Sequence, residues 1–190
     1  MALVSDTVAT GDLFTAYHDR ICHYIAGMIR DPAEAEDLTQ ETFLRAHCRQ
    51  EALRDPKAAR GWLYRIATNV CLDRLRQRAR HVALDRQDDL QRPRPAVPDA
   101  PSAQEHAERA ETSACVQRCL DYLPDSYRAV ILLYEAHGLT AQEIAELLDV
   151  SLGTIKIRLH RARRRLQEIM EIGCMVSEGN GGLPCCEARK

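Results

Sequence analysis

The chain has 190 residues, of which 28% are charged and 45% hydrophobic, with a formal net charge of −2, and this balance is ordinary for a soluble protein. The length fits one medium-sized domain or two small ones, and an aromatic content of only 5% disfavours a sheet-rich fold. No apolar stretch approaches the ~20 residues that span a bilayer, and the N-terminus lacks the basic and apolar regions of a secretory signal, so we expect a cytoplasmic protein without membrane insertion.

Three amphipathic helices are predicted in the N-terminal part of the chain. Apolar residues spaced three and four apart predict the first helix, over residues 13–29. Asp31 and Pro32 begin the second, with Asp31 as N-cap, Pro32 at the first helical position and Glu34 closing a capping box. A short helix and loop follow, and Gly61 precedes a third long helix.

The second and third helices each have an apolar face and a polar face, because residues three and four apart lie on the same side. In the second helix the apolar face holds Leu38, Phe43 and Ala46, and the exposed face holds Glu34, Asp37, Gln40 and Glu41. In the third helix Leu63, Ile66, Ala67 and Val70 share the apolar face, and the other face carries Trp62, Arg65, Asn69, Asp73 and Arg76.

A proline-rich segment divides the chain. Residues 92–101 read RPRPAVPDAP, and proline at that density forms neither a helix interior nor a central strand. The segment is therefore a linker of polyproline character. We expect an all-α fold of two small helical domains joined by a flexible linker, with the boundaries 10–82, 83–111 for the linker, 112–171, and 172–190 for a flexible, cysteine-containing tail.

Four helices are predicted after the linker, and the last two form a helix-turn-helix. The first runs from about Ser113 to Leu123, and the second starts at Asp125 and stops at a glycine, Gly138. Thr140 and Glu143 form a capping box that opens the third, and Ser151 caps the fourth. The fourth helix carries six basic residues and no acid between Thr154 and Arg165, which suits contact with phosphate. Its core face is predicted to hold Leu152, Ile155, Leu159 and Ala162 or Leu166.

Three segments together resemble a known family: DPAEAEDLTQETFLRA, GWLYRIATNVCLDRLRQR and LPDSYRAVILLYEAHGLTAQEIAELLDVSLGTIKIRLHRARRRL. In this order and across a proline-rich linker, they resemble a bacterial RNA polymerase sigma factor of the sigma-70 family, extracytoplasmic-function (group four) type. The resemblance covers roughly residues 10–80 and 112–170. It implies that this protein binds core RNA polymerase and promoter DNA and directs transcription initiation and strand opening. It also implies a role in a stress or metal/redox response, and an anti-sigma factor as a further partner.

The resemblance also implies roles for individual residues. Asp37, Gln40 and Glu41 correspond to the segment that docks on the polymerase clamp; a merely solvated polar face is the alternative. The third helix corresponds to the reader of the minus-10 element, for which the candidates are Arg60, Trp62, Arg65, Asn69, Arg74 and Arg76. Trp62 and Tyr64 offer stacking surfaces, although core packing is an equally good explanation of Trp62. The last helix corresponds to the minus-35 reader, with Ser151, Gly153, Thr154, Lys156, Arg158 and Arg161 as candidates.

The cysteines depart from the family pattern. Thiols on one helix face and in a glycine-rich tail suggest a zinc or copper site or a redox pair, although no cofactor is required. The candidates are Cys115, Cys119, Cys174, Cys185 and Cys186. The alternative is that cysteines pack as small apolar residues, which is favoured for Cys22, Cys48 and Cys71. Their spacing matches no standard zinc motif.

Two other functional classes are open at this stage. The chain lacks a glycine-rich phosphate loop, G-x-S-x-G and H-E-x-x-H, so the sequence favours a protein that is not an enzyme. One alternative is a helix-turn-helix regulator that binds DNA without polymerase, although its N-terminal part would then show a ligand-binding or receiver-like pattern. The other is a thiol or metal sensor whose output is DNA binding.

Overall fold

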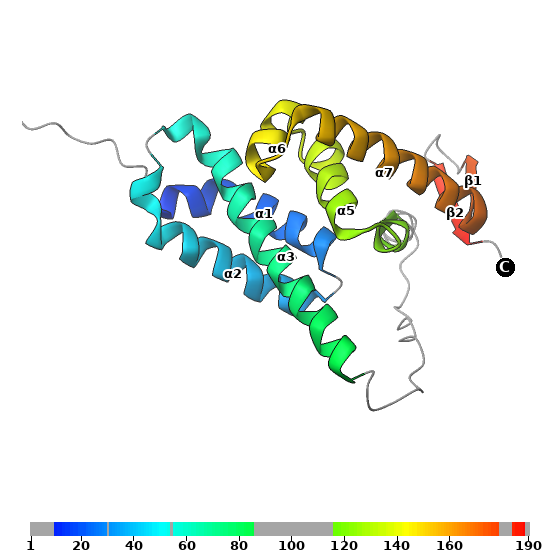
Figure 1. Ribbon diagram of the computed structural model, residues 1–190, viewed down its shortest axis with the longest axis horizontal. Helices are drawn as coiled ribbons and strands as arrows, with labels where there is room; N and C mark the ends of the chain where they lie inside the picture. The colour runs from blue at the N-terminus through cyan, green and yellow to red at the C-terminus, as the bar shows by residue number, and fades with distance from the viewer. Residues whose placement is uncertain (1–9, 30, 54, 86–115, 179–183, 189–190) are drawn as a thin grey trace, which may run out of the picture.

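The computed structural model describes residues 10–29, 31–53, 55–85, 116–178 and 184–188. Over these residues the chain is helical up to Gly173 and ends in a two-stranded hairpin (Figure 1). The N-terminal module comprises α1 (Thr10–Met28), α2 (Pro32–Cys48), the 3₁₀ turns Gln50–Ala52 and Pro56–Ala58, and α3 (Ala59–Asp85). The C-terminal module comprises a helical segment at 116–121, α5 (Asp125–Ile131), the π-helical turn η3 (Leu132–Ala136), α6 (Ala141–Leu148) and α7 (Leu152–Gly173).

The predicted all-α fold of two helical modules is confirmed. In the N-terminal module α1, α2 and α3 pack against one another, and every residue assigned to the apolar faces of α2 and α3 is buried. Asp31 caps α2 as expected, its carboxylate accepting hydrogen bonds from the backbone N–H groups of Ala33 and Glu34. None of the helices in the described part of the chain is long and apolar enough to cross a bilayer.

Two predictions about this module are wrong in detail. Glu34 does not close a capping box on the exposed face of α2; its carboxylate pairs with Arg74 and Arg78, which reach across from α3. Two guanidinium groups offer a carboxylate stronger hydrogen bonds than one backbone N–H does. In this arrangement the Glu34 side chain is only 12% exposed. The third helix begins at Ala59, so Gly61 lies inside its first turn rather than before it.

The helix-turn-helix forms as predicted. Thr140 and Glu143 make both halves of the capping box at the start of α6, and the hydrogen bonds from Thr140 hold the pKa of the Glu143 carboxyl below its ordinary value. Asp149, at the C-terminus of α6, adopts the left-handed conformation (φ 55°) that turns the chain into α7. Ser151 then accepts a hydrogen bond from the backbone N–H of Thr154 at 3.1 Å. Ile155, Leu159 and Ala162 are buried, while Leu152 and Leu166 are half-buried.

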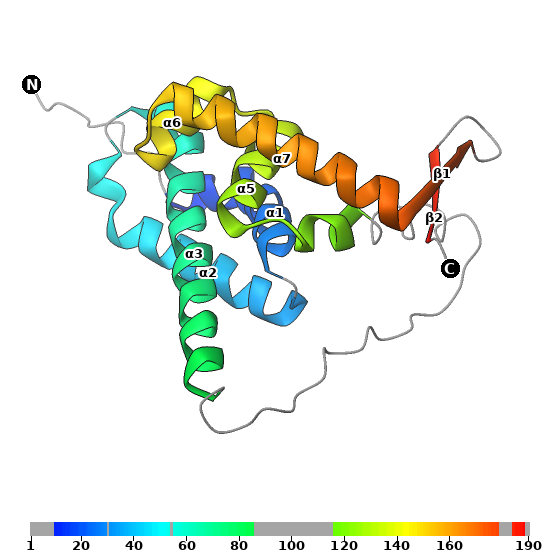
Figure 2. The same ribbon diagram turned by 45° about the vertical axis from the view of Figure 1, so that its right-hand side comes forward.

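The two modules pack directly on each other, which the sequence did not predict. α3 contacts α5 and α6, and α1 contacts α5 and η3 (Figure 2). The buried apolar residues of both modules form one continuous cluster. Gly27 of α1 lies so close to Leu132 of η3 that a Cβ atom at residue 27 would lie 3.0 Å from the leucine Cδ1.

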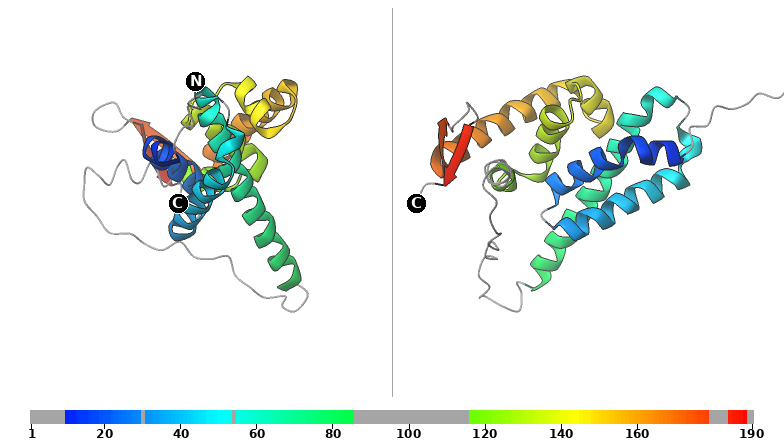
Figure 3. Two further views of the ribbon diagram at one scale, coloured as in Figure 1. Left: turned by 90° about the vertical axis from the view of Figure 1, so that its left-hand side faces the viewer. Right: turned by 180° about the vertical axis from the view of Figure 1, so that it is seen from behind.

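Part of the C-terminal tail has regular structure. β1 (Cys174–Glu178) continues directly from α7 and pairs antiparallel with β2 (Pro184–Ala188). The register sets Cys174 opposite Ala188, Cys185 opposite Ser177 and Cys186 opposite Val176. The hairpin stands at the far end of α7 from the N-terminal module (Figure 3). The prediction of a flexible tail did not include these strands.

Candidate nucleic-acid and protein interfaces

The exposed stripe of α2 is a candidate protein-binding face. Asp37 and Gln40 are exposed, and Glu41 is half-exposed and accepts a hydrogen bond from Arg45 at 2.6 Å. Leu44 continues the stripe at the next helical turn and is 66% exposed, which is high for leucine. Leu44 was not among the predicted residues of this face, although its position four residues after Gln40 and three after Glu41 was the available signal. An apolar residue bordered by polar groups is typical of protein interfaces.

The candidate DNA-binding residues of α3 fall into two groups. Arg65, Asn69 and Arg76 are exposed, and Arg76 also pairs with Asp73 at 3.1 Å. Trp62 is half-buried against the apolar core, in agreement with the packing alternative.

The other candidates on α3 are engaged within the protein. Arg74 forms its ion pair with Glu34, and Arg60 donates a hydrogen bond to the backbone carbonyl of His137 in the C-terminal module. Tyr64, suggested as a stacking surface, is 1% exposed, so that suggestion is wrong in this arrangement. Its ring packs under the C-terminal module, which the apolar pattern of α3 does not reveal.

His137 connects the modules, and no sequence motif identified it. Its Nδ1 lies 2.9 Å from the Tyr64 hydroxyl, and its ring meets the edge of the Tyr24 ring at a centroid distance of 5.5 Å. Burial, together with nearby His23, Arg60 and Arg20, lowers the pKa of His137 to about 4. The imidazole is therefore neutral near pH 7 and can share a hydrogen bond with Tyr64.

A polar cleft separates α3 from the helix-turn-helix. Its volume is about 510 Å³. The N-terminal module contributes Arg65, Asn69, Leu72 and Arg76 to its lining, and the C-terminal module contributes Asp125, Ser126, Ala129, Leu147, Leu148, Asp149, Val150 and Arg158. Candidate residues for two different DNA elements therefore line the same space.

Three of the six basic residues between Thr154 and Arg165 in α7 stay exposed but form ion pairs within the protein. Arg163 pairs with Glu135 at 2.7 Å and lies 5.1 Å from the centroid of the Tyr134 ring. Arg164 and Arg165 both pair with Glu168. Among the described residues, the basic candidates nearer the start of α7 are not in ion pairs of this kind. Ser151, Gly153, Lys156 and Arg161 are exposed, and Thr154 and Arg158 are half-buried. The start of α7 is therefore the end suited to contact a ligand outside the protein.

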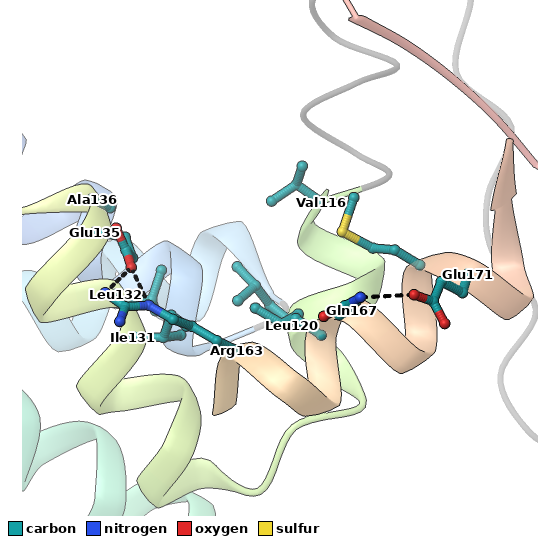
Figure 4. Close-up of a pocket in the computed structure, with 11 residues that line it drawn as sticks. Val116, Leu120, Ile131, Leu132, Glu135, Ala136, Arg163, Gln167 and Glu171 are labelled. Carbon is teal, nitrogen blue, oxygen red and sulfur yellow. Dashed lines mark hydrogen bonds and ion pairs between the residues drawn. The ribbon is translucent and has the colours of Figure 1, made fainter. Parts of the chain in front are cut away.

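An apolar groove runs along the other side of α7 (Figure 4). It has a volume of about 610 Å³ and lies between the helical segment at 116–121, the α5–η3 region and α7. Val116, Leu120 and Met170 supply apolar lining, and the pairs Arg163–Glu135 and Gln167–Glu171 lie along it.

The cysteine candidates occupy separate parts of the chain. Cys119 is buried, and Cys115 lies outside the described residues. Cys174, Cys185 and Cys186 are in the hairpin at the end of α7. Within the ranges that the structure describes, no group of three or more His, Cys, Asp or Glu residues is arranged to hold a metal ion. Burial raises the pKa of the Cys71 thiol to about 12, as expected for a packing residue. Cys48 is exposed, so the packing interpretation is wrong for that cysteine, and Cys22 is half-buried.

Comparison with known proteins assigns both modules. Residues 13–81 match the family model described as sigma-70 region 2, and residues 113–166 match sigma-70, region 4. The ECF RNA polymerase sigma factor SigW of Bacillus subtilis is 34% identical over 86% of this chain and 89% of its own length. The ECF RNA polymerase sigma factor SigE of Mycolicibacterium smegmatis is also 34% identical, and the match covers 84% of this chain and 60% of SigE. The sigma factor RpoE of Bartonella quintana, solved in complex with the anti-sigma factor NepR, shares the fold with a TM-score of 0.63. The two sequences are 23% identical, and the match covers 84% of this chain and 94% of the RpoE chain.

Proposed function

The chain belongs to the ECF RNA polymerase sigma factors of the sigma-70 family, and we propose from this membership which of its surfaces carry out each step of initiation. As a sigma factor, the protein binds core RNA polymerase and directs it to promoters, where transcription starts. The observation that carries this function is the pair of matches to region 2 and region 4, one on each helical module. A regulator acting without polymerase is disfavoured, because region 2 accounts for the whole N-terminal module.

The exposed stripe of α2 is the proposed polymerase-docking face. Its support is the exposure of Asp37, Gln40 and Leu44 on one side of a helix whose opposite side is buried. The carboxylates of Asp37 and Glu41 would meet basic groups of the polymerase. Leu44 would supply an apolar contact beside them.

Charge reversal on this face tests the function and the site together. We expect Asp37→Lys with Glu41→Lys to weaken binding to core polymerase at least about 10-fold, since like charges placed across an interface cost several kcal/mol. Binding is measured by fluorescence anisotropy of labelled protein, and promoter-specific run-off transcription should fall in parallel. Wild-type protein must support run-off transcription from core polymerase, or the proposed function is refuted.

Glu51 offers a matched control for the same experiment. It is exposed in the 3₁₀ turn Gln50–Ala52 that follows α2 and lies outside the proposed docking face. Glu51→Lys should leave core binding within about two-fold of wild type. If the double reversal also bound normally, the docking face would lie elsewhere in the molecule.

Promoter recognition is proposed to divide between the two modules. Arg65, Asn69 and Arg76 of α3 would meet the minus-10 element, with Asn69 suited to reading a base edge and the arginines suited to holding phosphates. The start of α7 would enter the major groove at the minus-35 element through Ser151, Gly153, Thr154, Lys156, Arg158 and Arg161. Chemical catalysis would belong to the polymerase, so the chain itself would not be an enzyme.

The setting proposed for this activity is the cytoplasm, in a stress or metal/redox response. The RpoE relative was solved with an anti-sigma factor, which supports an inhibitor of that kind as a further partner here. The candidate metal ligands are Cys174, Cys185 and Cys186 in the tail, with Cys115 and Cys119 nearer the start of the C-terminal module.

The tail hypothesis has a direct test. Thiolates bind zinc or copper and lose the metal as pH falls, because protons compete for sulfur. We expect about one equivalent of metal by elemental analysis of the wild-type protein and none in a Cys174→Ser, Cys185→Ser, Cys186→Ser variant. A Cys48→Ser variant serves as the control, because Cys48 is an exposed cysteine of α2. Equal metal content in all three proteins would exclude the site.

A further inference from the structure

Ile157 is an exposed apolar residue in the middle of the side of α7 that is proposed to face DNA. Ile155 and Leu159, two residues before and two residues after it, are 0% and 5% exposed, whereas Ile157 is 53% exposed. Two residues correspond to roughly 200° around an α-helix, so Ile157 points almost directly away from the core. Its side chain therefore adds little to the packing of the C-terminal module.

The groups around Ile157 are basic or already hydrogen-bonded. Lys156 and Arg161 are exposed on either side of it. The hydroxyl oxygens of Ser151 and Thr154 lie 2.8 Å apart and share a hydrogen bond, and the Ser151 hydroxyl also accepts from the Thr154 backbone N–H. These two hydroxyls are thus engaged at the start of the helix. The middle of this face is apolar, with a cation on each side.

Gly153 lies one turn before Ile157, on the same side of the helix. The fold does not require glycine there, because a Cβ atom at this position would meet only the Ser151 Oγ at 3.8 Å, an ordinary contact distance. Its φ is also not positive. Glycine is nevertheless one of the least favourable residues inside a helix. Its bare backbone lets a ligand approach α7 closely beside the Ile157 side chain.

We propose that Ile157 reads a thymine of the minus-35 element through the C5-methyl group of that base, and that Gly153 lets the helix come close enough to do so. The inference rests on the proposed function, in which the start of α7 enters the major groove. Among the four bases only thymine presents a methyl group there, and apolar side chains recognise it by contact. Lys156 and Arg161 supply the polar contacts that fix the helix in the groove.

The charge around Ile157 favours DNA as the partner of this face. No acidic residue occurs between Thr154 and Arg165, so the face attracts a polyanion. The other bases present amino donors or ring and carbonyl acceptors in the major groove, and isoleucine can bond to none of them. A polar base edge covered by Ile157 would lose its hydrogen bonds to water, which disfavours every base except thymine.

Removing single methyl groups from the DNA tests this contact. The probe is a duplex selected from a randomised library by holoenzyme, reconstituted from core polymerase and the full-length protein. Each thymine is then replaced in turn by deoxyuridine, which lacks only the C5-methyl group. One of these replacements should weaken binding of the wild-type holoenzyme about four-fold, the effect of burying one methyl group. With Ile157→Ala the same replacement should change affinity less than about 1.5-fold, because the partner of the methyl group is gone.

Val116→Ala is the matched control for Ile157→Ala. Val116 is also an exposed apolar residue of the C-terminal module, at 47%, but it lines the groove on the other side of α7. Its holoenzyme should show the full methyl effect at the same base pair. Ile157→Val keeps a branched apolar side chain and should retain most of that effect.

Gly153→Ala distinguishes DNA contact from protein stability. Alanine favours the helix and the position has room for its methyl group, so stability in urea should equal or exceed that of the wild type. The added methyl group would hold the base pair away from Ile157, so binding should weaken at least about four-fold and the deoxyuridine effect should disappear. Gly61→Ala makes the same change in the first turn of α3, where nothing lies within 4 Å of the added atom, and should leave the methyl effect in place.

The outcomes separate this inference from the proposed function. If the wild-type holoenzyme enriches no sequence beyond those that core polymerase enriches alone, the sigma-factor function is at fault. If it enriches a sequence but every deoxyuridine replacement affects wild type and Ile157→Ala equally, Ile157 does not read thymine and the inference is overturned. A selected sequence that contains no enriched thymine would overturn it as well.

Discussion

Replacing Arg128 by Met is expected to lower the free energy of unfolding by about 3–5 kcal/mol. Arg128 is 4% exposed, and its guanidinium donates hydrogen bonds to the carbonyls of Leu120, Asp121, Leu123 and Met28. Methionine has similar length and no donor, so these acceptors would lose a bonding partner while remaining largely shielded from water.

Urea denaturation followed by circular dichroism measures this loss, with Arg118→Met as the control. Arg118 is an exposed arginine in the helical segment at 116–121, and its replacement should change the unfolding free energy by less than about 0.5 kcal/mol. Arg128→Lys should recover only part of the stability, because an ammonium group cannot reproduce the planar fork of donors. A loss below about 1 kcal/mol for Arg128→Met would mean that water replaces the guanidinium in this position.

Removing the positive charges at the start of α7 should produce the second large effect. A triple variant with alanine at Lys156, Arg158 and Arg161 is expected to bind minus-35 promoter DNA about 100-fold more weakly, at about 1 kcal/mol or more for each residue. Each phosphate contact that is lost should also reduce the slope of log affinity against log salt by about one unit. A residue that reads a base would instead cost ~1–3 kcal/mol at one promoter position and little at the others.

Single alanine variants and a salt titration of DNA binding distinguish these two kinds of residue. Arg164→Ala is the matched control: it removes one charge from the same helix, where Arg164 is 74% exposed and paired with Glu168. Its salt slope and affinity should stay close to those of the wild type. If the triple variant kept the wild-type footprint and slope, α7 would not be the DNA-reading helix.

Local signals predicted most of the secondary structure. The helices of the N-terminal module follow from apolar residues at helical spacing, and the boundaries of α2 and α6 follow from caps at Asp31 and Thr140. These signals act over three or four residues, so a single sequence contains them in full. The π-helical turn at Leu132–Ala136 has no such signal, since its residues fit an ordinary α-helix equally well.

Contacts between distant residues account for what the sequence did not reveal. Glu34 was assigned to a local cap because its partners Arg74 and Arg78 lie 40 and 44 residues away. Tyr64 and His137 are 73 residues apart, and neither belongs to a motif that would pair them. The proline-rich segment indicated two separate modules, and composition alone does not show whether two modules pack together.

The same distinction applies to the candidate sites. Exposed polar stripes on α2 and basic residues at the start of α7 follow from helical periodicity, and the structure leaves most of them accessible. Periodicity does not show that Arg60 and Arg74 have intramolecular partners, or that Leu44 is exposed on the polar stripe. The hairpin after α7 was also not predicted, because it consists of two short segments rather than an extended alternating pattern.

The hydrogen bond between Arg128 and the Met28 carbonyl has a consequence for biosynthesis. These residues are 100 positions apart, and synthesis proceeds from the N-terminus at about 5–20 residues per second. α3 ends at Asp85, 43 positions before Arg128, so the first three helices are synthesised about 2–9 seconds before this partner residue. During that interval the end of α1 and the Tyr24–Tyr64 region face water or another protein. A nascent chain of this length displays its proposed polymerase-docking face together with the surface that later packs on the C-terminal module, a combination that the finished protein lacks.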